Sequence, residues 1–254
     1  NLSNPTILQG NQYMDATTYT GTSGSPANQS ITSLAFQPDF GWWKKRSAAY
    51  DHCLIDSVRG VTKQLYSNLT NAEGTDSAPL ISFDTNGFTV GNSNYTNYGT
   101  QVAWCWKAGG AGGSSNTAGS ITSTVSANTT SGFSVVTYTG NATSGATVGH
   151  GLGVKPAMII QKTRSITNNW KVWHQSLPNA NTQLSPNSAL PQITLNGTGA
   201  YDSAPNDNLK AIGSSTITLG ANDQSNPSGG TMVMYAFAEV AGFSKFGSYT
   251  GNGS

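Results

Sequence analysis

The chain has 254 residues, of which only 9% are charged, and its formal net charge is +1. This length favours two domains. The near-neutral charge argues against nucleic acid as a partner, because nucleic-acid binders carry a basic surface. No apolar run approaches the length that inserts into a membrane. The chain starts without Met and ends on Gly253-Ser254, so we interpret it as a piece of a longer protein.

Residues 1–16 are expected to form a lead-in segment, and residues 17–108 a first module. Short runs rich in Val, Ile, Thr, Tyr and Trp alternate there with Gly, Asn, Ser and Pro clusters, which is typical of an antiparallel sandwich or barrel. Asn86-Gly87 predicts a type I′ hairpin turn, in which both central residues have a positive φ. Strands are predicted at 17–21, 29–34, 38–46, 51–58, 63–67, 79–83, 87–90 and 100–107.

The stretch 109–119 is rich in Gly and Ser and is expected to be a flexible linker. A second module follows at 120–242, and residues 243–254 lead onward from it. Strands in this module are predicted at 133–139, 146–149, 156–164, 169–176, 191–195, 209–212, 215–219 and 230–239. The predicted fold class is therefore all-β, with two tandem antiparallel β-sandwich modules.

The two modules repeat one another. The segment 35–47 aligns with 153–165 at a shift of 118 positions, and Pro, Lys, Arg and Ser stand in the same places. Tyr19-Thr20-Gly21 returns as Tyr138-Thr139-Gly140, and Tyr249-Thr250-Gly251 opens a third round. A repeat of this size is a whole small domain. Tandem copies favour length or multivalency over a single deep active site.

Alternation along the strands places large apolar residues on one face in both modules. We interpret this face as core. The residues assigned to it are Phe40, Trp42, Val102, Trp104 and Trp106 in the first module and Met158, Ile160, Val233, Tyr235 and Phe237 in the second.

Three other tryptophans are candidate glycan contacts, namely Trp43, Trp170 and Trp173. Trp43 aligns with Gln161, which indicates a wetter position, and the first module has no aromatic residue to match the other two. An exposed indole can cover the apolar face of a sugar ring while neighbouring amides bond its hydroxyls. A structural role for these residues is the alternative.

The polar pattern Lys-x-Arg-Ser recurs at 44–47 and 162–165. We predict a structural role, in which Arg46 pairs with Asp56 or Asp51 on the neighbouring strand through a bidentate contact. Arg164 would face a neutral acceptor instead. Ligand binding is the alternative.

The residues that usually carry catalysis are sparse. Neither Glu73 nor Glu239 belongs to a carboxylate pair of the kind that sandwich glycosidases use. No Gly-x-Ser-x-Gly elbow occurs, and the three His have no metal-ligand spacing. We predict no enzymatic activity and no cofactor, although loop residues Asp202, Asp207 and Asp223 leave a Ca²⁺ site open.

The two cysteines align with apolar residues in the second module. Cys53 corresponds to Val172 and Cys105 to Ala236. Both are therefore interpreted as buried apolar positions, and a Cys53–Cys105 disulfide is the alternative.

Several strings resemble a repeated module of tail-fibre and other virion structural proteins of marine and cyanobacterial bacteriophages. They are Phe-Gln-Pro-Asp-Phe (36–40), Asp-Ser-Val-Arg-Gly (56–60), Ser-Asn-Leu-Thr-Asn-Ala-Glu (67–73) and the segments 82–88, 102–110 and 249–254. The resemblance implies a sandwich of the jelly-roll or lectin-like kind, with no catalytic or binding residues to carry over. The second module lacks 56–60 and 71–73, so any role of these segments belongs to the first.

The sequence thus predicts a non-enzymatic structural or adhesive protein of the virion, such as a tail fibre, an appendage or a capsid decoration. Its expected partners are other virion subunits, in a symmetric homo-oligomer such as a trimer, and a host-surface glycan bound with avidity. Three alternatives stay open: a carbohydrate-binding module of a secreted bacterial protein, a purely structural capsid or tube component, and a glycosidase.

Overall fold

The computed structural model describes residues 5–182, 189–203 and 207–253. The first four residues of the predicted lead-in and Ser254 lie outside this part of the chain. The described residues confirm the all-β fold class, with one short 3₁₀ turn, η1 (Gly10–Gln12), as the helical element among them. No helix among them has the length and apolar character to cross a membrane.

The first half of the chain contributes nine strands to the described fold. They are β1 (Met14–Thr20), β2 (Gln29–Ile31), β3 (Phe40–Lys45), β4 (Cys53–Asp56), β5 (Lys63–Tyr66), β6 (Gly74–Thr75), β7 (Ser82–Asp84), β8 (Gly87–Val90) and β9 (Thr100–Trp106). They form a large sheet in the order β1-β9-β3-β4-β5-β6 and a small sheet in the order β2-β8-β7.

The second half contributes the remaining described strands. They are β10 (Ser114–Asn116), β11 (Ser123–Asn128), β12 (Phe133–Thr139), β13 (Thr147–Gly149), β14 (Met158–Thr163), β15 (Lys171–His174), β16 (Ile193–Thr194), β17 (Leu209–Ile212), β18 (Thr216–Leu219) and β19 (Thr231–Phe237). The large sheet has the order β10-β11-β12-β19-β14-β15-β16, and the small sheet has the order β13-β18-β17.

Corresponding strands occupy the same places in both halves. The run β1-β9-β3-β4-β5 matches β12-β19-β14-β15-β16, and β2-β8-β7 matches β13-β18-β17. The paired strands run antiparallel in both halves, for example β3 with β9 and β14 with β19. The second half adds β10 and β11 along the outer edge of β12. The sequence repeat is therefore a repeat of topology.

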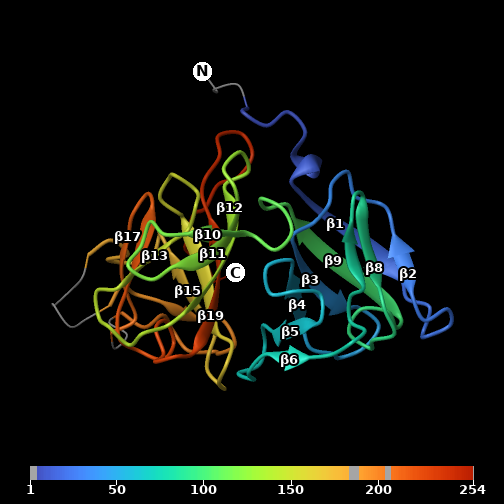
Figure 1. Cartoon of the computed structure of the whole chain (residues 1–254). Coiled ribbons are helices and arrows are strands. Elements are labelled where there is room, and N and C mark those ends of the chain that lie inside the picture. The colour runs from blue at the N-terminus through green and yellow to red at the C-terminus, as the bar shows by residue number, and fades with distance from the viewer. Residues whose placement is uncertain (1–4, 183–188, 204–206, 254) are drawn as a thin grey trace.

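Three buried apolar clusters separate four layers of sheet. The first fills the sandwich between the two sheets of the first half and includes Phe88 and Cys105. The second fills the sandwich of the second half and includes Trp173 and Met234. The third lies between the two large sheets, so each large sheet is covered on both faces. Figure 1 shows the halves side by side, with the N-terminal segment above them.

The third cluster shows that the predicted core face does not line the interior of either sandwich. Tyr235 and Phe237 do lie on one buried face, and so does Phe40, but this face meets the other half of the chain. The interior of the first sandwich is lined instead by the small residues Ala103 and Cys105 of β9. Alternation identifies residues that share a face but does not say which face of a doubly covered sheet looks inward.

The predicted hairpin at Asn86-Gly87 is present, but its turn differs from the prediction. Asp84 pairs with Gly87, so Thr85 and Asn86 are the central residues. Neither has a positive φ, and the type I′ prediction is therefore wrong. Gly87 is needed for another reason, because a Cβ there would lie 1.8 Å from the carbonyl oxygen of Ile31 on the adjacent strand.

The predicted flexible linker 109–119 is partly wrong, because it contains β10, which pairs with β11. Its glycines permit close packing of backbone. A Cβ on Gly109 would lie 2.5 Å from the carbonyl oxygen of Ala127, and a Cβ on Gly113 would lie 2.9 Å from the backbone of Val125. The two-residue β6 and the six-residue β11 were not predicted either, and β1 already begins within the predicted lead-in.

Candidate functional site

The most distinctive part of the molecule is the interface between the two large sheets, which we call the central interface. Its aromatic rings stack across the two halves. Phe40 lies 4.2 Å from Tyr235, centroid to centroid, and 5.9 Å from Phe133. The ring of Trp106 lies 6.2 Å from Phe133 and also 6.2 Å from Phe237. The apolar part of this interface therefore resembles the core of a domain.

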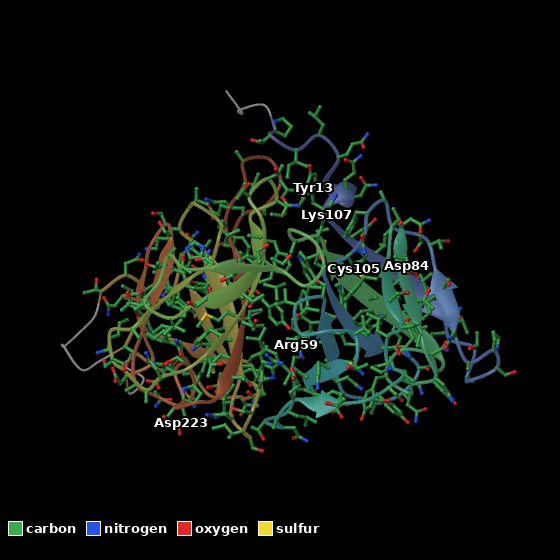
Figure 2. The ribbon with its side chains drawn as sticks, viewed as in Figure 1. Tyr13, Arg59, Asp84, Cys105, Lys107 and Asp223 are labelled. Atoms are coloured by element: carbon green, nitrogen blue, oxygen red, sulfur yellow. The ribbon has the colours of Figure 1, made fainter. Side chains whose placement is uncertain are left out.

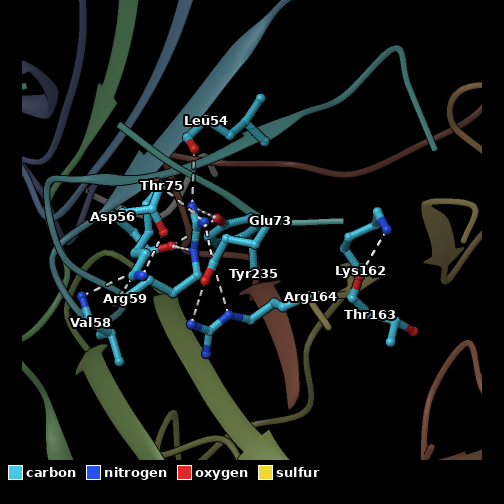
Figure 3. A network of polar contacts seen from close by, with 11 residues as sticks. Leu54, Asp56, Val58, Arg59, Glu73, Thr75, Lys162, Thr163, Arg164 and Tyr235 are labelled. Atoms are coloured by element: carbon cyan, nitrogen blue, oxygen red, sulfur yellow. Dashed lines mark hydrogen bonds and ion pairs between the residues drawn. The ribbon is translucent and has the colours of Figure 1, made fainter. Parts of the chain in front are cut away.

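A buried ionic group lies within this apolar surface (Figure 3). The Nε of Arg59 lies 2.5 Å from Oδ2 of Asp56, and both side chains are fully buried. Asp56 Oδ1 accepts the backbone N–H groups of Val58 and Arg59, which fixes the turn after β4. Tyr235 of the other half donates its hydroxyl to Asp56 Oδ2 at 2.8 Å, while Arg59 donates to the Tyr235 oxygen at 3.0 Å.

Glu73 extends this group to a second arginine. It lies 3.0 Å from Nη1 of Arg59 and accepts two parallel bonds of 2.8 Å from Nε and Nη2 of Arg164. The backbone N–H of Glu73 also donates to the carbonyl of Arg164 at 2.8 Å. Two arginines and two carboxylates balance in formal charge, and the two hydrogen bonds to Arg164 have the fork geometry of a strong pair.

The pKa shifts in this group follow from burial opposed by the ion pairs. Burial alone would lower the pKa of Arg59, but the adjacent carboxylate of Asp56 and then Glu73 outweigh it and raise the pKa. Burial would raise the pKa of Glu73, but its bonds to Arg164 and the charge of Arg59 hold that pKa below its ordinary value. Both side chains stay charged at neutral pH. We call Asp56, Arg59, Glu73, Arg164 and Tyr235 the interface ionic cluster.

The predicted pairing of Arg46 with Asp56 or Asp51 is wrong. Asp56 is taken by Arg59, and Arg46 is an exposed residue. Asp51 accepts a hydrogen bond from Asn68 instead. Arg164 does make a structural polar contact, but its partner is Glu73 of the other half. The useful signal was that 56–60 and 71–73 occur in one repeat only, since these segments supply Asp56, Arg59 and Glu73.

The recurrence of Lys-x-Arg-Ser has a structural cause. Lys44 donates to the carbonyls of Lys45 and Tyr50, and Lys162 donates to those of Thr163 and Ile166. In each half the lysine thereby donates hydrogen bonds to backbone carbonyls at the end of a strand and in the loop that follows it. The matching serines, Ser47 and Ser165, accept the backbone N–H of Thr100 and Thr231, the first residues of β9 and β19.

The recurrence of Tyr-Thr-Gly also has a structural cause. Tyr19 donates its hydroxyl to the carbonyl of Thr96, and Tyr138 donates its hydroxyl to that of Ser225. The glycine two residues later packs against backbone in both halves. A Cβ would lie 2.2 Å from the carbonyl carbon of Asn97 at Gly21 and 2.3 Å from the carbonyl oxygen of Pro227 at Gly140.

The three predicted glycan contacts are all fully buried, so that prediction is wrong. Trp43 lies in the core of the first half, with its ring 5.2 Å from Phe88. Trp170 lies in the central interface and donates its indole N–H to the carbonyl of Tyr66. Trp173 lies in the second core. The alignment of Trp43 with Gln161 does not indicate an exposed position, because Gln161 is itself only 1% exposed and donates a hydrogen bond to Asn208.

Trp42 and Trp104 are half-buried and lie directly opposite each other on β3 and β9. They lie on the same face of the first large sheet as Phe40 and Trp106, beyond the apolar cluster, where Ala16 of β1 stands next to Trp104 and is exposed. Trp104 belongs to none of the three apolar clusters, and Trp42 touches only the edge of the third. We call Trp42 and Trp104 the tryptophan pair. Both were expected in the core, and both are half-buried instead.

Polar groups border the tryptophan pair. Trp42 donates its indole N–H to Nδ1 of His52 at 3.1 Å. Burial, and then the nearby charge of Lys44, lower the pKa of His52, which keeps its Nδ1 available as an acceptor at neutral pH. The pair is thus an indole surface with one ring fixed in orientation.

A cavity of about 610 Å³ opens at one end of the central interface. We call it the terminal cavity. Its lining comes from the lead-in segment, from both large sheets and from the turn after β19. The lining residues are Pro5, Ile7, Leu8, Gly10, Tyr13, Met14, Trp106, Ser131, Gly132, Phe133, Phe237, Ala238, Gly242, Phe243 and Ser244.

Both glutamates and Asp207 form ion pairs. Glu239 lies 2.7 Å from Lys245, as Glu73 lies against two arginines. Asp207 pairs with Lys210, and the residues that the structure describes include no group of three or more metal-ligating side chains that could hold an ion. Cys53 and Cys105 are free and buried, and burial raises the pKa of both thiols.

Fold and site together define an all-β protein of antiparallel sheets with a buried central interface. The chain belongs to the family described as "Domain of unknown function (DUF7483)", which matches residues 9–254. No curated protein matches the sequence, and no solved structure matches it.

Proposed function

We propose that this chain is a non-enzymatic structural and adhesive subunit of a virion, such as a phage tail fibre, an appendage or a capsid decoration. The proposal rests on the central interface, together with the resemblance of the sequence to virion modules. In this role the repeated halves supply a stiff building block, and copies assemble with other virion subunits into a symmetric homo-oligomer.

The observation that carries this proposal is the interface ionic cluster. A hinge between two halves that close on a substrate would be expected to have a wet, polar contact. Here Arg59 is fully buried and bonds both halves, through Asp56 on one side and Tyr235 on the other. Separating the halves would expose apolar rings and leave these charges without partners, so the contact favours a fixed unit that transmits load.

The test is cryo-electron microscopy of purified particles that carry this protein. The expected result is density for the two halves in the arrangement of Figure 1, repeated by symmetry on a fibre, appendage or capsid. Fab fragments raised against the chain should label the same place. A protein that is absent from intact particles, and is found only as a free secreted monomer, would contradict the proposal.

Carbohydrate contact is the second part of the proposal, and the tryptophan pair favours it. Two indoles on neighbouring strands stand about 5 Å apart at their Cβ atoms, which suits the spacing of a sugar ring packed against aromatic faces. Thr18 and Thr20 are exposed on β1 beside them and offer hydroxyls at the edge of the sheet. A host-surface glycan would therefore lie across β1, β9 and β3.

An array of bacterial surface polysaccharides tests the glycan contact. We expect Trp104→Ala to weaken binding at least about tenfold, or about 1.4 kcal/mol. The matched control is Tyr201→Ala, since Tyr201 is exposed but lies far along the chain in the second half. Equal binding by the two variants would contradict the contact. Absence of binding to any polysaccharide would instead favour the purely structural capsid or tube component.

A further inference from the structure

The terminal cavity is built from parts that hold one another in place. Tyr13 and Phe243 meet edge to face at 6.2 Å and form one wall. Trp106, Phe133 and Phe237 form the floor, and these rings also pack into the central interface. Figure 2 shows Tyr13 and Lys107 close together beside the N-terminal segment. Both halves thus contribute walls, so the cavity exists only when the halves are docked.

The chemistry of the lining selects a class of ligand. None of the residues that line the cavity carries a charge, and five of them are aromatic. A volume of about 610 Å³ falls within the range of small-molecule sites, roughly 300–1,000 Å³. Tyr13 is a lining residue, and among the described residues no group bonds its hydroxyl, so that hydroxyl is available to a ligand.

We propose that the terminal cavity binds an uncharged, largely apolar small molecule that carries one hydrogen-bond acceptor. The ligand would pack its body against Trp106, Phe133 and Phe237 and accept a bond from Tyr13. A charged ligand is disfavoured, because burial of an ion without a partner is costly. The proposal does not depend on the proposed virion function or on the tryptophan pair.

The neutral dye N-phenyl-1-naphthylamine is the probe. Titration of the full chain should give a saturable rise in dye fluorescence with one site per chain. Met14→Trp fills the cavity from β1 and should weaken dye binding at least tenfold. Trp104→Ala removes a half-buried indole outside the cavity and should leave dye binding unchanged, which controls for general attraction of the dye to aromatic surfaces.

Two further measurements keep the test decisive. Ser131→Phe fills the cavity from the second half and should act like Met14→Trp, so the result stands even if one variant fails to fold. In the wild-type chain, bound dye should slow amide exchange at 131–133, Ala238 and 242–244, which line the cavity. Binding that survives both filling variants, or that leaves this exchange unchanged, overturns the proposal.

Self-association is the competing use of this cavity. Leu8 lies at its edge and is 87% exposed, so it could insert into a second copy. If dye is excluded as the chain concentration rises, and Leu8→Ser both abolishes dimers and restores dye binding, the cavity is an interface between copies and the small-molecule proposal is wrong. Dye binding that is independent of chain concentration supports the proposal.

Discussion

At the scale of single residues, the interface ionic cluster shows why a buried charge persists in a chain with so few charges. Arg59 occupies its donors with Asp56, Glu73, Tyr235 and the carbonyl of Leu54. A buried ion pair adds little net stability when complete, but removal of one partner is strongly destabilising. The cluster therefore specifies how the halves dock more than it strengthens the fold.

Replacement of Arg59 should be the most damaging single change in the cluster. Arg59→Met leaves the buried Asp56 without its cation and Glu73 with Arg164 alone, and we expect a loss of about 3–5 kcal/mol in the free energy of unfolding. Urea unfolding followed by tryptophan fluorescence measures it. Arg46→Met is the matched control, because Arg46 is exposed, and it should change stability by less than about 0.5 kcal/mol. Similar losses in the two variants would contradict this account.

Lys162 predicts a pH dependence of stability. The side chain is fully buried, and burial lowers its pKa from 10.5 to about 8. The unfolded chain then binds more protons than the folded chain between about pH 8 and 10.5. Stability due to this group is therefore fully present above about pH 10.5 and is lost as the pH falls from about 10.5 to about 8. The difference is at most about 3 kcal/mol.

Comparison with Lys162→Met isolates this effect. Buried thiols and tyrosines also titrate above pH 8 in the unfolded chain, but they do so equally in both proteins. The free energy of unfolding of the wild type should rise relative to that of Lys162→Met as the pH is raised from 8 to 10.5. A difference between the two proteins that stays constant over this range would show that burial does not lower the pKa of Lys162.

At the scale of elements, the repeat is maintained by contacts at strand ends. Gly140 directly follows β12, and a Cβ there would lie 2.3 Å from the carbonyl oxygen of Pro227. Gly140→Ala should therefore cost about 1–3 kcal/mol through overpacking, as measured by thermal unfolding. Gly74→Ala is the control, because Gly74 is exposed and nothing lies within 4 Å of its added Cβ. Equal melting temperatures of the two variants would refute this role of Gly140.

The elements were largely predictable, and the site was not. Each predicted strand range overlaps an observed strand, since alternation and turn residues are local signals. The short β6 and β10 were not predicted, because a run of two or three small or polar residues shows no hydrophobic periodicity. Trp43 was expected to be exposed but is fully buried, and Trp104 was expected in the core but is half-buried. Trp43 is covered by the small sheet of its own half, whereas Trp104 lies on the face that meets the other half but outside the apolar cluster there. Both exposures therefore depend on long-range contacts.

At the scale of the whole molecule, the central interface makes the two halves thermodynamically dependent on each other. Phe40 belongs to the first half, yet its closest aromatic partner is Tyr235 of the second, at 4.2 Å. Large apolar contacts of this kind couple the unfolding of neighbouring units. We therefore expect the chain to unfold as one cooperative unit, although each half has its own core.

Phe88→Ala tests this coupling, because Phe88 is fully buried in the first core and belongs to no cluster shared with the second half. Its loss should lower the free energy of unfolding by about 3–5 kcal/mol. Native-state amide exchange should then accelerate by the same factor in β9 and in β19. Phe40→Ala, at the interface itself, should also act equally on both strands. If β19 keeps its wild-type protection in Phe88→Ala, the halves unfold separately, and the central interface serves as a contact between independent domains.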